Sequence, residues 1–274
     1  MSGCRMFVTD LDGTLAGGDR TVGAVNRRCL EALGERGVLR VIATGRSLYS
    51  VRAVLEPAFP VDYLAFSSGA GIVHWPSGRL VRSSRLTWEE TAGAVEVLLR
   101  AGADFMVHRR IPVNHRFLWY GSGEENLDFR RRIDLYRNCC SAGPIPLPEG
   151  EYCQVVAIFP PGGAGEFERV RSRFPGLTAV RSTSPLDRRS IWLEIYPAGV
   201  SKAAAARWLA ARHGIRREET GGIGNDYNDH DLLSWVAEAF VVANAPGELR
   251  SLFPVVASNR DDGFSEAARR LFRP

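Results

Sequence analysis

The chain has 274 residues, of which 45% are hydrophobic and 24% are charged, a composition typical of globular proteins. The formal net charge of +4 is too small to predict nucleic-acid binding, and no apolar run reaches the roughly 18 residues that a membrane span needs. The length allows one large domain or two ordinary ones. The five cysteines lack metal-binding spacing, so we expect reduced thiols and a cytoplasmic protein.

The first predicted strand ends on an unusual group of polar residues. Met6-Phe7-Val8 is an apolar trio typical of a buried parallel strand, and Asp10-Leu11-Asp12-Gly13-Thr14 follows it closely. Two carboxylates this close repel each other unless a cation lies between them. Gly13 allows a sharp turn or a close approach to a ligand. The alternative interpretation is a turn rich in Asp and Gly that simply ends a strand.

A second strand over 38–43 ends in Thr44-Gly45-Arg46. A helix is predicted before it, over 22–35, and another after it, to about residue 56. This alternation predicts an α/β fold with a doubly wound parallel sheet. Thr44 then lies at the carboxyl end of its strand, as Asp10 does, where ligands bind in such sheets. Thr44 and the Gly45 amide are typical of a phosphate-binding site at the start of a helix, although an ordinary helix N-cap has the same pattern.

The order of predicted helices and strands changes after a third strand over 62–66 and a hairpin that ends near residue 81. From 83 to 196, a helix followed by two strands occurs twice, which predicts an antiparallel sheet with helices on one face. Polar clusters around Arg109, Arg116 and Arg188 are either solvated loop charges or contacts to an anionic substrate. The expected elements are helices over 87–100, 124–138 and 164–174 and strands over 104–108, 115–120, 154–159, 177–181 and 191–196.

The α/β pattern resumes near Gly199. Ser201 is a good helix N-cap, but Lys202 lies in the first turn, where the helix dipole disfavours a cation; this misfit is typical of a functional lysine. A strand over 220–224 is followed by a segment, 225–231, with three Asp and two Asn residues. Oxygen ligands at a strand end predict a site for a hard cation.

Together these segments resemble the motifs of the haloacid dehalogenase (HAD) superfamily, and the whole chain resembles its Cof-type phosphatases of subfamily IIB. Asp10 to Thr14 resembles the first motif, Thr44-Gly45-Arg46 the second, Lys202 the third, and 225–229 the fourth. The resemblance implies a Rossmann-like core formed by 1–82 and 197–274. It also implies an inserted α+β cap of the C2B type, 83–196, that sets substrate specificity.

The resemblance further implies a Mg²⁺-dependent phosphatase for a small phosphorylated metabolite, a sugar phosphate among the candidates. Asp10 would be the nucleophile and Asp12 the acid and base, while Thr44 and Lys202 would hold the phosphoryl oxygens. The implied substrate contacts are Gly45, Arg46 and Asn228, and the implied metal ligands are Asp10, Asp12, Asn225, Asp226 and Asp229. We expect no nucleic-acid or membrane partner, and the sequence does not predict an oligomeric state.

Two alternatives remain open from the sequence. One is a phosphomutase of related fold, which would return the phosphate to the substrate. The other is a non-catalytic regulator that binds phosphate or metal, because Asn225 stands where the family carries its first metal-binding Asp and Asp226 lies one place later. The chain has no P-loop pattern, which argues against a kinase that binds a nucleoside triphosphate.

Overall fold

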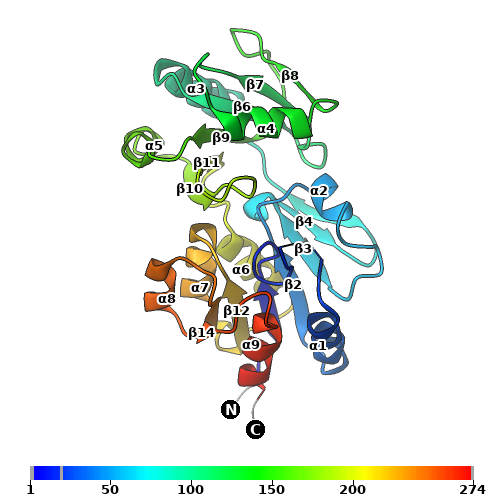
Figure 1. Cartoon of the computed structure of the whole chain (residues 1–274). Coiled ribbons are helices and arrows are strands. Elements are labelled where there is room, and N and C mark those ends of the chain that lie inside the picture. The colour runs from blue at the N-terminus through cyan, green and yellow to red at the C-terminus, as the bar shows by residue number, and fades with distance from the viewer. Residues whose placement is uncertain (1–2, 19–20, 273–274) are drawn as a thin grey trace. The chain divides into compact units, whose positions relative to one another are not determined.

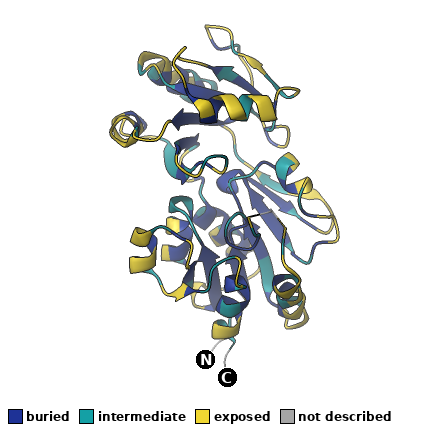
Figure 2. Cartoon of the chain, in the orientation of Figure 1, coloured by how far each residue is buried: buried dark blue, intermediate teal, exposed yellow. Residues whose placement is uncertain are grey.

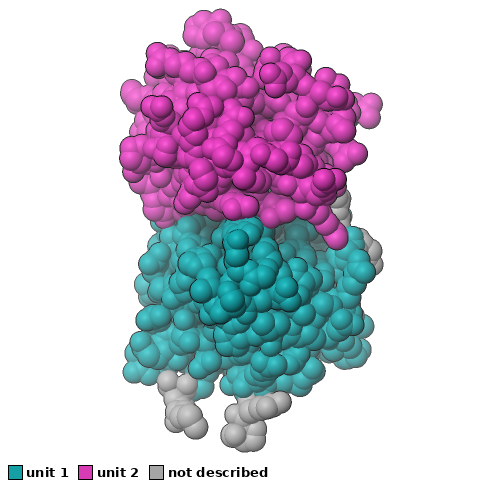
Figure 3. All heavy atoms as spheres, turned by 60° about the vertical axis from the view of Figure 1, so that its left-hand side comes forward, with its two compact units in different colours: residues 1–82, 201–274 teal, residues 83–200 magenta. Residues whose placement is uncertain are grey.

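The computed structural model describes residues 3–18 and 21–272 and divides the chain into two compact units (Figure 3). The core unit consists of Met1–Arg82 and Ser201–Pro274, and the inserted unit is Ser83–Val200. The sequence predicts the end of the insertion at Tyr196, whereas the compact unit extends to Val200. Within the described ranges, no helix is both long and apolar enough to cross a bilayer.

The core unit is built on one eight-stranded sheet with the order β14-β13-β12-β1-β2-β3-β4-β5 (Figure 1). Neighbouring strands from β14 to β3 are parallel, and β4 runs antiparallel to β3. Because β12, β1 and β2 are adjacent and parallel, the residues that follow them meet at one edge of the sheet. The strands are β1 (Met6–Thr9), β2 (Leu39–Ala43), β3 (Tyr63–Phe66), β4 (Gly71–His74), β5 (Arg79–Ser83), β12 (Thr220–Gly224), β13 (Glu238–Val242) and β14 (Val255–Val256).

Helices cover both faces of this sheet. Met6 and Val8 of β1 belong to the same buried cluster as Leu209 of α6, whereas Phe7 faces the other way and its ring centroid lies 5.4 Å from that of Phe264 in α9. The alternation of β1 therefore packs one helix layer on each side, which confirms the predicted doubly wound α/β core. The core helices are α1 (Ala24–Glu35), α2 (Leu48–Arg52), α6 (Lys202–Arg212), α7 (His230–Trp235), α8 (Gly247–Leu252) and α9 (Gly263–Leu271), with short 3₁₀ turns at Ser67–Gly69, Arg217–Glu219 and Tyr227–Asp229.

Helix α6 packs closely on the core sheet because most of its buried side chains are small, and this packing places Lys202, its first residue, at the site. Ala203, Ala205, Ala206 and Ala210 are all buried. Alanine favours helix and has little bulk, so the helix can pack closely on the sheet. The Ser201 hydroxyl accepts a hydrogen bond from the Ala204 amide, which fixes where the helix begins.

The inserted unit contains a six-stranded sheet with the order β10-β11-β9-β6-β7-β8. Figure 2 shows its strands as largely buried, with exposed residues on the helices and loops. Its strands are β6 (Asp104–Arg109), β7 (Phe117–Tyr120), β8 (Cys140–Ala142), β9 (Tyr152–Phe159), β10 (Thr178–Thr183) and β11 (Ile191–Tyr196). Its helices are α3 (Trp88–Arg100), α4 (Leu127–Leu135) and α5 (Ala164–Arg171).

The prediction of an antiparallel sheet with helices on one face is wrong in two respects. Helices α3 and α5 pack with Phe105 on one face, but α4 packs with Met106 on the opposite face. The sheet is also mixed, because the short strand β8 pairs parallel to β7. Phe105 and Met106 are consecutive in β6 and both are large and apolar, so helices must pack on each face of the sheet.

Candidate active site

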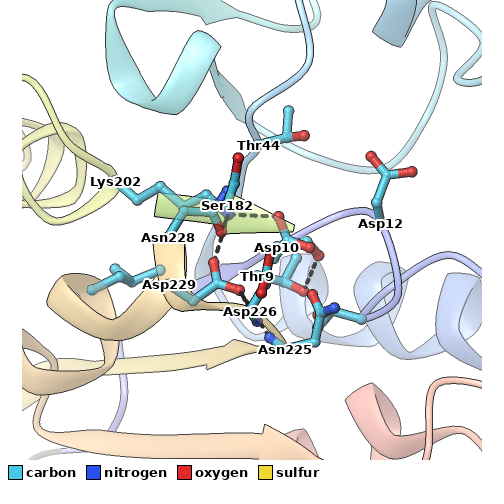
Figure 4. A network of polar contacts seen from close by, with 12 residues as sticks. Thr9, Asp10, Asp12, Thr44, Ser182, Lys202, Asn225, Asp226, Asn228 and Asp229 are labelled. Atoms are coloured by element: carbon cyan, nitrogen blue, oxygen red, sulfur yellow. Dashed lines mark hydrogen bonds and ion pairs between the residues drawn. The ribbon is translucent and has the colours of Figure 1, made fainter. Parts of the chain in front are cut away.

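Lys202 is the centre of the polar cluster at the carboxyl edge of the core sheet (Figure 4). Its Nζ donates to Asp10 Oδ1 at 2.7 Å, to Asp229 Oδ1 at 2.5 Å and to Asn228 Oδ1 at 3.2 Å. A lysine ammonium has three donors, and here each one has an oxygen acceptor from a different residue. The side chain is only 1% exposed, so this cluster fixes the ammonium beside the Asp10 carboxylate.

The electrostatics of the cluster leave excess negative charge. Burial lowers the pKa of Lys202, but the facing carboxylates of Asp10 and Asp229 outweigh this effect and raise the pKa overall, so the ammonium stays charged. The pKa of Asp10 is raised to about 7: burial is the largest cause, the charges of Asp229 and Asp12 also raise the pKa, and the ammonium of Lys202 opposes them. One ammonium shared by two buried carboxylates is a site that a second cation would stabilise.

Asp229 is buried and orients the segment that follows β12. Its Oδ2 accepts hydrogen bonds from the backbone amides of Asn225 at 2.8 Å and Asp226 at 3.0 Å. Gly224 permits this close approach, because a Cβ at that position would lie 2.5 Å from the Asp229 side chain. Asp226 joins the cluster through its amide, and the assignment of Asp226 and Asp229 as metal ligands stays a prediction.

The Asn225 side chain reaches the turn after β1. One terminal atom of its amide lies 2.9 Å from Thr14 Oγ1, 2.9 Å from the Asp12 carbonyl oxygen and 3.1 Å from Asp10 Oδ2. Gly13 has φ +77°, and a Cβ there would lie 2.8 Å from the same amide, so only glycine fits. The Thr14 hydroxyl therefore pairs with the Asn225 side chain.

These atoms fit a Mg²⁺ site of mixed donors. Mg²⁺ keeps oxygen ligands at about 2.1 Å in octahedral geometry, which sets neighbouring oxygens about 3 Å apart. The separations from the Asn225 amide to Asp10 Oδ2 and to the Asp12 carbonyl have this length. No group of three or more His, Cys, Asp or Glu side chains in the described residues is arranged to hold a metal. The donor set here is instead one carboxylate, one backbone carbonyl and one amide.

Asp12 directs its carboxylate away from this cluster and toward the segment after β2 (Figure 4). Arg46 Nε donates to Asp12 Oδ2 and Arg46 Nη2 donates to Oδ1, each at 2.6 Å. Strand β1 ends at Thr9, so the two carboxylates lie in a turn rather than on one face of a strand. The sequence predicted Arg46 as a substrate contact and did not predict its pairing with Asp12.

The remaining predicted residues lie on the segments that follow β2 and β12. Thr44 is 1% exposed, and its hydroxyl accepts a hydrogen bond from the Arg46 amide at 3.2 Å. Gly45 is half-buried between them. Asn228 meets Lys202 as described above. The adjacency of β1, β2 and β12 therefore brings Asp10, Asp12 and Thr44 to one edge of the sheet, and the first residue of α6 adds Lys202.

Two features of the site were not assigned a role from the sequence. Asn244, after β13, donates from Nδ2 to the Gly13 carbonyl at 2.8 Å and accepts from the Asn259 amide, so it holds the turn that carries Asp12. The second feature was available in the sequence, because Lys202 is the only lysine in the chain. Every other basic residue among the 35 Lys and Arg is an arginine, which marks this position as one that needs a compact ammonium.

The family comparison matches almost the whole chain. A sequence profile of the haloacid dehalogenase-like hydrolases matches residues 7–267. The chain is 26% identical over 257 residues to an HMP-PP phosphatase of Cronobacter sakazakii, which covers 91% of this chain and 88% of that protein. It is 22% identical over 276 residues to a 5-amino-6-(5-phospho-D-ribitylamino)uracil phosphatase of Bacillus subtilis, with 94% of each chain covered.

A solved structure shows the same fold. The HAD subclass IIB sugar phosphatase BT4131 superimposes with a TM-score of 0.75 at 19% sequence identity. The match covers 97% of this chain and 98% of that one. The succession of helices and strands in this chain therefore follows a known fold.

Proposed function

Because the chain belongs to the haloacid dehalogenase-like hydrolase family and is a phosphatase of its Cof type, we propose that it hydrolyses a small phosphorylated metabolite through an aspartyl-phosphate on Asp10. The relatives act on small phosphorylated compounds, which supports this substrate class, with a sugar phosphate among the candidates. The five cysteines in the described residues are free thiols, which supports our proposal of a reducing, cytoplasmic location.

The observation that carries the proposal is the contact between Lys202 Nζ and Asp10 Oδ1 at 2.7 Å. A carboxylate is a weak nucleophile toward a phosphate dianion because the two repel each other. A fixed ammonium beside Asp10 offsets this repulsion and can bind a phosphoryl oxygen as charge develops. The other oxygen, Asp10 Oδ2, faces the Asn225 amide and the Asp12 carbonyl, where we propose that Mg²⁺ binds. Bound there, Mg²⁺ would neutralise negative charge and fix the phosphoryl group.

In the first step, a carboxylate oxygen of Asp10 attacks phosphorus in line, and the bond from phosphorus to the ester oxygen breaks. Asp12 gives its proton to the departing alcohol. In the second step, Asp12 takes a proton from water, which attacks phosphorus, releases inorganic phosphate and restores Asp10. Thr44 and Lys202 would hold the phosphoryl oxygens, with Gly45, Arg46 and Asn228 as substrate contacts.

We also propose that the inserted unit, predicted over 83–196, acts as the cap that selects the substrate. Support comes from the separate hydrophobic core of this unit and from its continuous insertion between β5 and α6. Arg109, at the end of β6, and Arg116 and Arg188 are the candidates for contacts to the part of the substrate that does not react.

The test is phosphate release from a panel of phosphorylated metabolites with and without Mg²⁺, together with p-nitrophenyl phosphate. Asp10→Asn keeps the shape but removes the attacking oxyanion, so we expect turnover to fall by more than about 10³-fold. The folded state should persist, because a buried repelling charge is removed. Substantial activity in Asp10→Asn would disprove the nucleophile assignment, and an isomeric phosphate product instead of free phosphate would indicate a phosphomutase.

A further inference from the structure

The Asn225 amide is the feature of the site that the family pattern does not explain. One terminal atom of this amide lies among three oxygens: Thr14 Oγ1 at 2.9 Å, the Asp12 carbonyl at 2.9 Å and Asp10 Oδ2 at 3.1 Å. The oxygen and the nitrogen of an amide are similar in size, so either can occupy this position after a half-turn of the side chain. The choice between them depends on what else is present.

Without a cation, the nitrogen belongs at this position. When Asp10 is ionised, the two hydrogens of this nitrogen can be donated to Asp10 Oδ2 and to the Asp12 carbonyl, neither of which has a hydrogen to donate. An oxygen there would gain one hydrogen bond from the Thr14 hydroxyl but would face the other two oxygens with no hydrogen between them. A buried carboxylate left without a donor on that side costs free energy, so the nitrogen orientation is favoured.

With Mg²⁺ the preference reverses. The amide must then present Oδ1, and the Thr14 hydroxyl, 2.9 Å away, can donate to it. The separations of 3.1 and 2.9 Å already match the spacing of about 3 Å between neighbouring ligands of Mg²⁺. A half-turn of one amide therefore converts the site between the two states while the backbone stays in place.

We propose that the Asn225 amide takes the place of the cation in the metal-free enzyme, by donating from Nδ2, and turns to present Oδ1 when a divalent cation binds. This inference rests on the proposed function, because it uses the same cation site. An aspartate at 225 has no hydrogen to donate and adds a carboxylate beside Asp10 and Asp229. Asn225 therefore gives a stable metal-free state and a weaker hold on the cation than aspartate would give.

The test compares the full-length wild type with Asn225→Asp and with Asn138→Asp, an exposed substitution in the insertion that adds the same charge far from Asn225 in the sequence. Mg²⁺ affinity is measured by titration calorimetry and thermal unfolding is measured in EDTA and in Mg²⁺. Without metal, Asn225→Asp should unfold at a lower temperature than wild type. It should bind Mg²⁺ about tenfold more tightly, and Mg²⁺ should raise its unfolding temperature by more than it raises that of wild type. Asn138→Asp should match the wild type in all three measurements.

Nuclear magnetic resonance observes the hydrogens of the Asn225 side-chain amide directly. The side-chain NH₂ resonances of Asn225 are assigned by their loss in Asn225→Asp. In metal-free wild type they should exchange slowly with solvent because both hydrogens are bonded, and Mg²⁺ should shift them and speed their exchange. Unchanged resonances on Mg²⁺ binding would overturn the inference.

The results also separate this inference from the proposed function. If wild type releases phosphate with Mg²⁺ but Asn225→Asp has the same Mg²⁺ affinity and the same metal-free unfolding temperature, the inference fails and the phosphatase stands. If Mg²⁺ binds to neither protein, the inference fails together with the proposed metal dependence. If Mg²⁺ binds as expected but no substrate releases phosphate, only the proposed function fails.

Discussion

Arg46 holds Asp12 in a two-pronged ion pair, with Nε to Oδ2 and Nη2 to Oδ1 each at 2.6 Å. This geometry fixes the plane of the carboxylate as well as its position. Arg46 itself is restrained by hydrogen bonds from Nη1 to the Ser50 carbonyl and hydroxyl. The proposed acid and base of the reaction is thus oriented by the segment that also carries Thr44.

Arg46→Lys tests whether this orientation matters for catalysis. A lysine keeps the charge but cannot form both hydrogen bonds in one plane. We expect kcat on an alkyl phosphate to fall by about 10–100-fold, because the acid is misplaced by a fraction of an ångström, whereas loss of the proposed substrate contact alone would raise KM. Steady-state kinetics check this, with the exposed Arg52→Lys of α2 as the matched control. A rise in KM with unchanged kcat would instead support a direct substrate contact.

Asp12→Asn tests the acid and base role. The amide can no longer give a proton to the leaving alcohol, so hydrolysis of an alkyl phosphate should slow by about 10²–10⁴-fold. Nitrophenolate departs without a proton, so its release in the first turnover should remain fast. Further release should then stop, because Asp12→Asn no longer activates the water that hydrolyses the aspartyl-phosphate. A rapid-mixing measurement of nitrophenolate detects this burst. Equal losses in the first step for both substrates would argue against the role.

Lys202→Met tests how much of the folding stability depends on the buried cluster. It leaves Asp10 and Asp229 without their shared ammonium in a site where Lys202 is 1% exposed. Removing one partner of a buried ion pair typically lowers the free energy of unfolding by about 3–5 kcal/mol. Urea unfolding in EDTA measures the change. The double variant with Asp10→Asn should recover part of the loss, and full additivity would show that the two side chains do not interact.

Lys202→Arg gives a second comparison at the same position. A guanidinium is larger and planar, so it cannot place its donors toward the three oxygens that surround Nζ. We expect it to be inactive and less stable than wild type although this chain uses arginine at every other basic position. Wild-type stability in this variant would show that charge alone is enough.

The positions of the site residues in the core were predictable because they follow from strand order. Asp10, Thr44 and Asn225 each come directly after a strand, and the α/β pattern makes those strands parallel, so their ends share one edge. The pairing of Arg46 with Asp12 was not predictable in the same way. It depends on the rotamers of two flexible side chains in turns, which spacing along the sequence does not determine.

The error in the inserted unit has a different physical reason. Phe129, Ile133 and Tyr136 indicate that α4 has an apolar face, but they do not say which side of the sheet receives it. The evidence lay in the strands, because Phe105 and Met106 are consecutive and both large. A strand that is apolar on both faces needs helices on both faces. The prediction followed the repeated order of one helix and two strands instead, and this order does not show which face a helix covers.

Arginines of the insertion test the proposed cap function. Arg116 and Arg188 are exposed, whereas Arg109 lies over the Tyr152 ring at 5.3 Å and donates to its hydroxyl. Alanine at a substrate contact should raise KM for the true substrate several-fold and leave p-nitrophenyl phosphate hydrolysis unchanged. Arg109→Ala should also lower stability by about 1 kcal/mol through lost packing on the ring. If no variant separates the two substrates, our choice of residues is wrong.

His108 predicts a pH dependence of stability in the insertion. The residue is 4% exposed, its Nδ1 donates to the Asn114 carbonyl at 2.8 Å, and its Nε2 has no hydrogen-bond partner among the described residues. Burial lowers the pKa of His108 to about 3, helped by the charge of Arg132 and opposed by the bond to Asn114. The histidine is therefore neutral in the folded state throughout the mildly acidic range.

In the unfolded chain, the pKa of a histidine is about 6.5, so below that pH the unfolded state binds one more proton than the folded state. Stability should then fall as the pH drops from about 6.5 toward 3, by up to about 1.4 kcal/mol per pH unit from this residue. His108→Gln keeps a donor for the Asn114 carbonyl and removes the titrating group, so its stability should depend less on pH. Urea unfolding at about pH 7 and about pH 5 measures the difference, with the exposed His230→Gln as control. An equal loss of stability in wild type and His108→Gln would show that the ring is protonated, or accessible to water, in the folded protein.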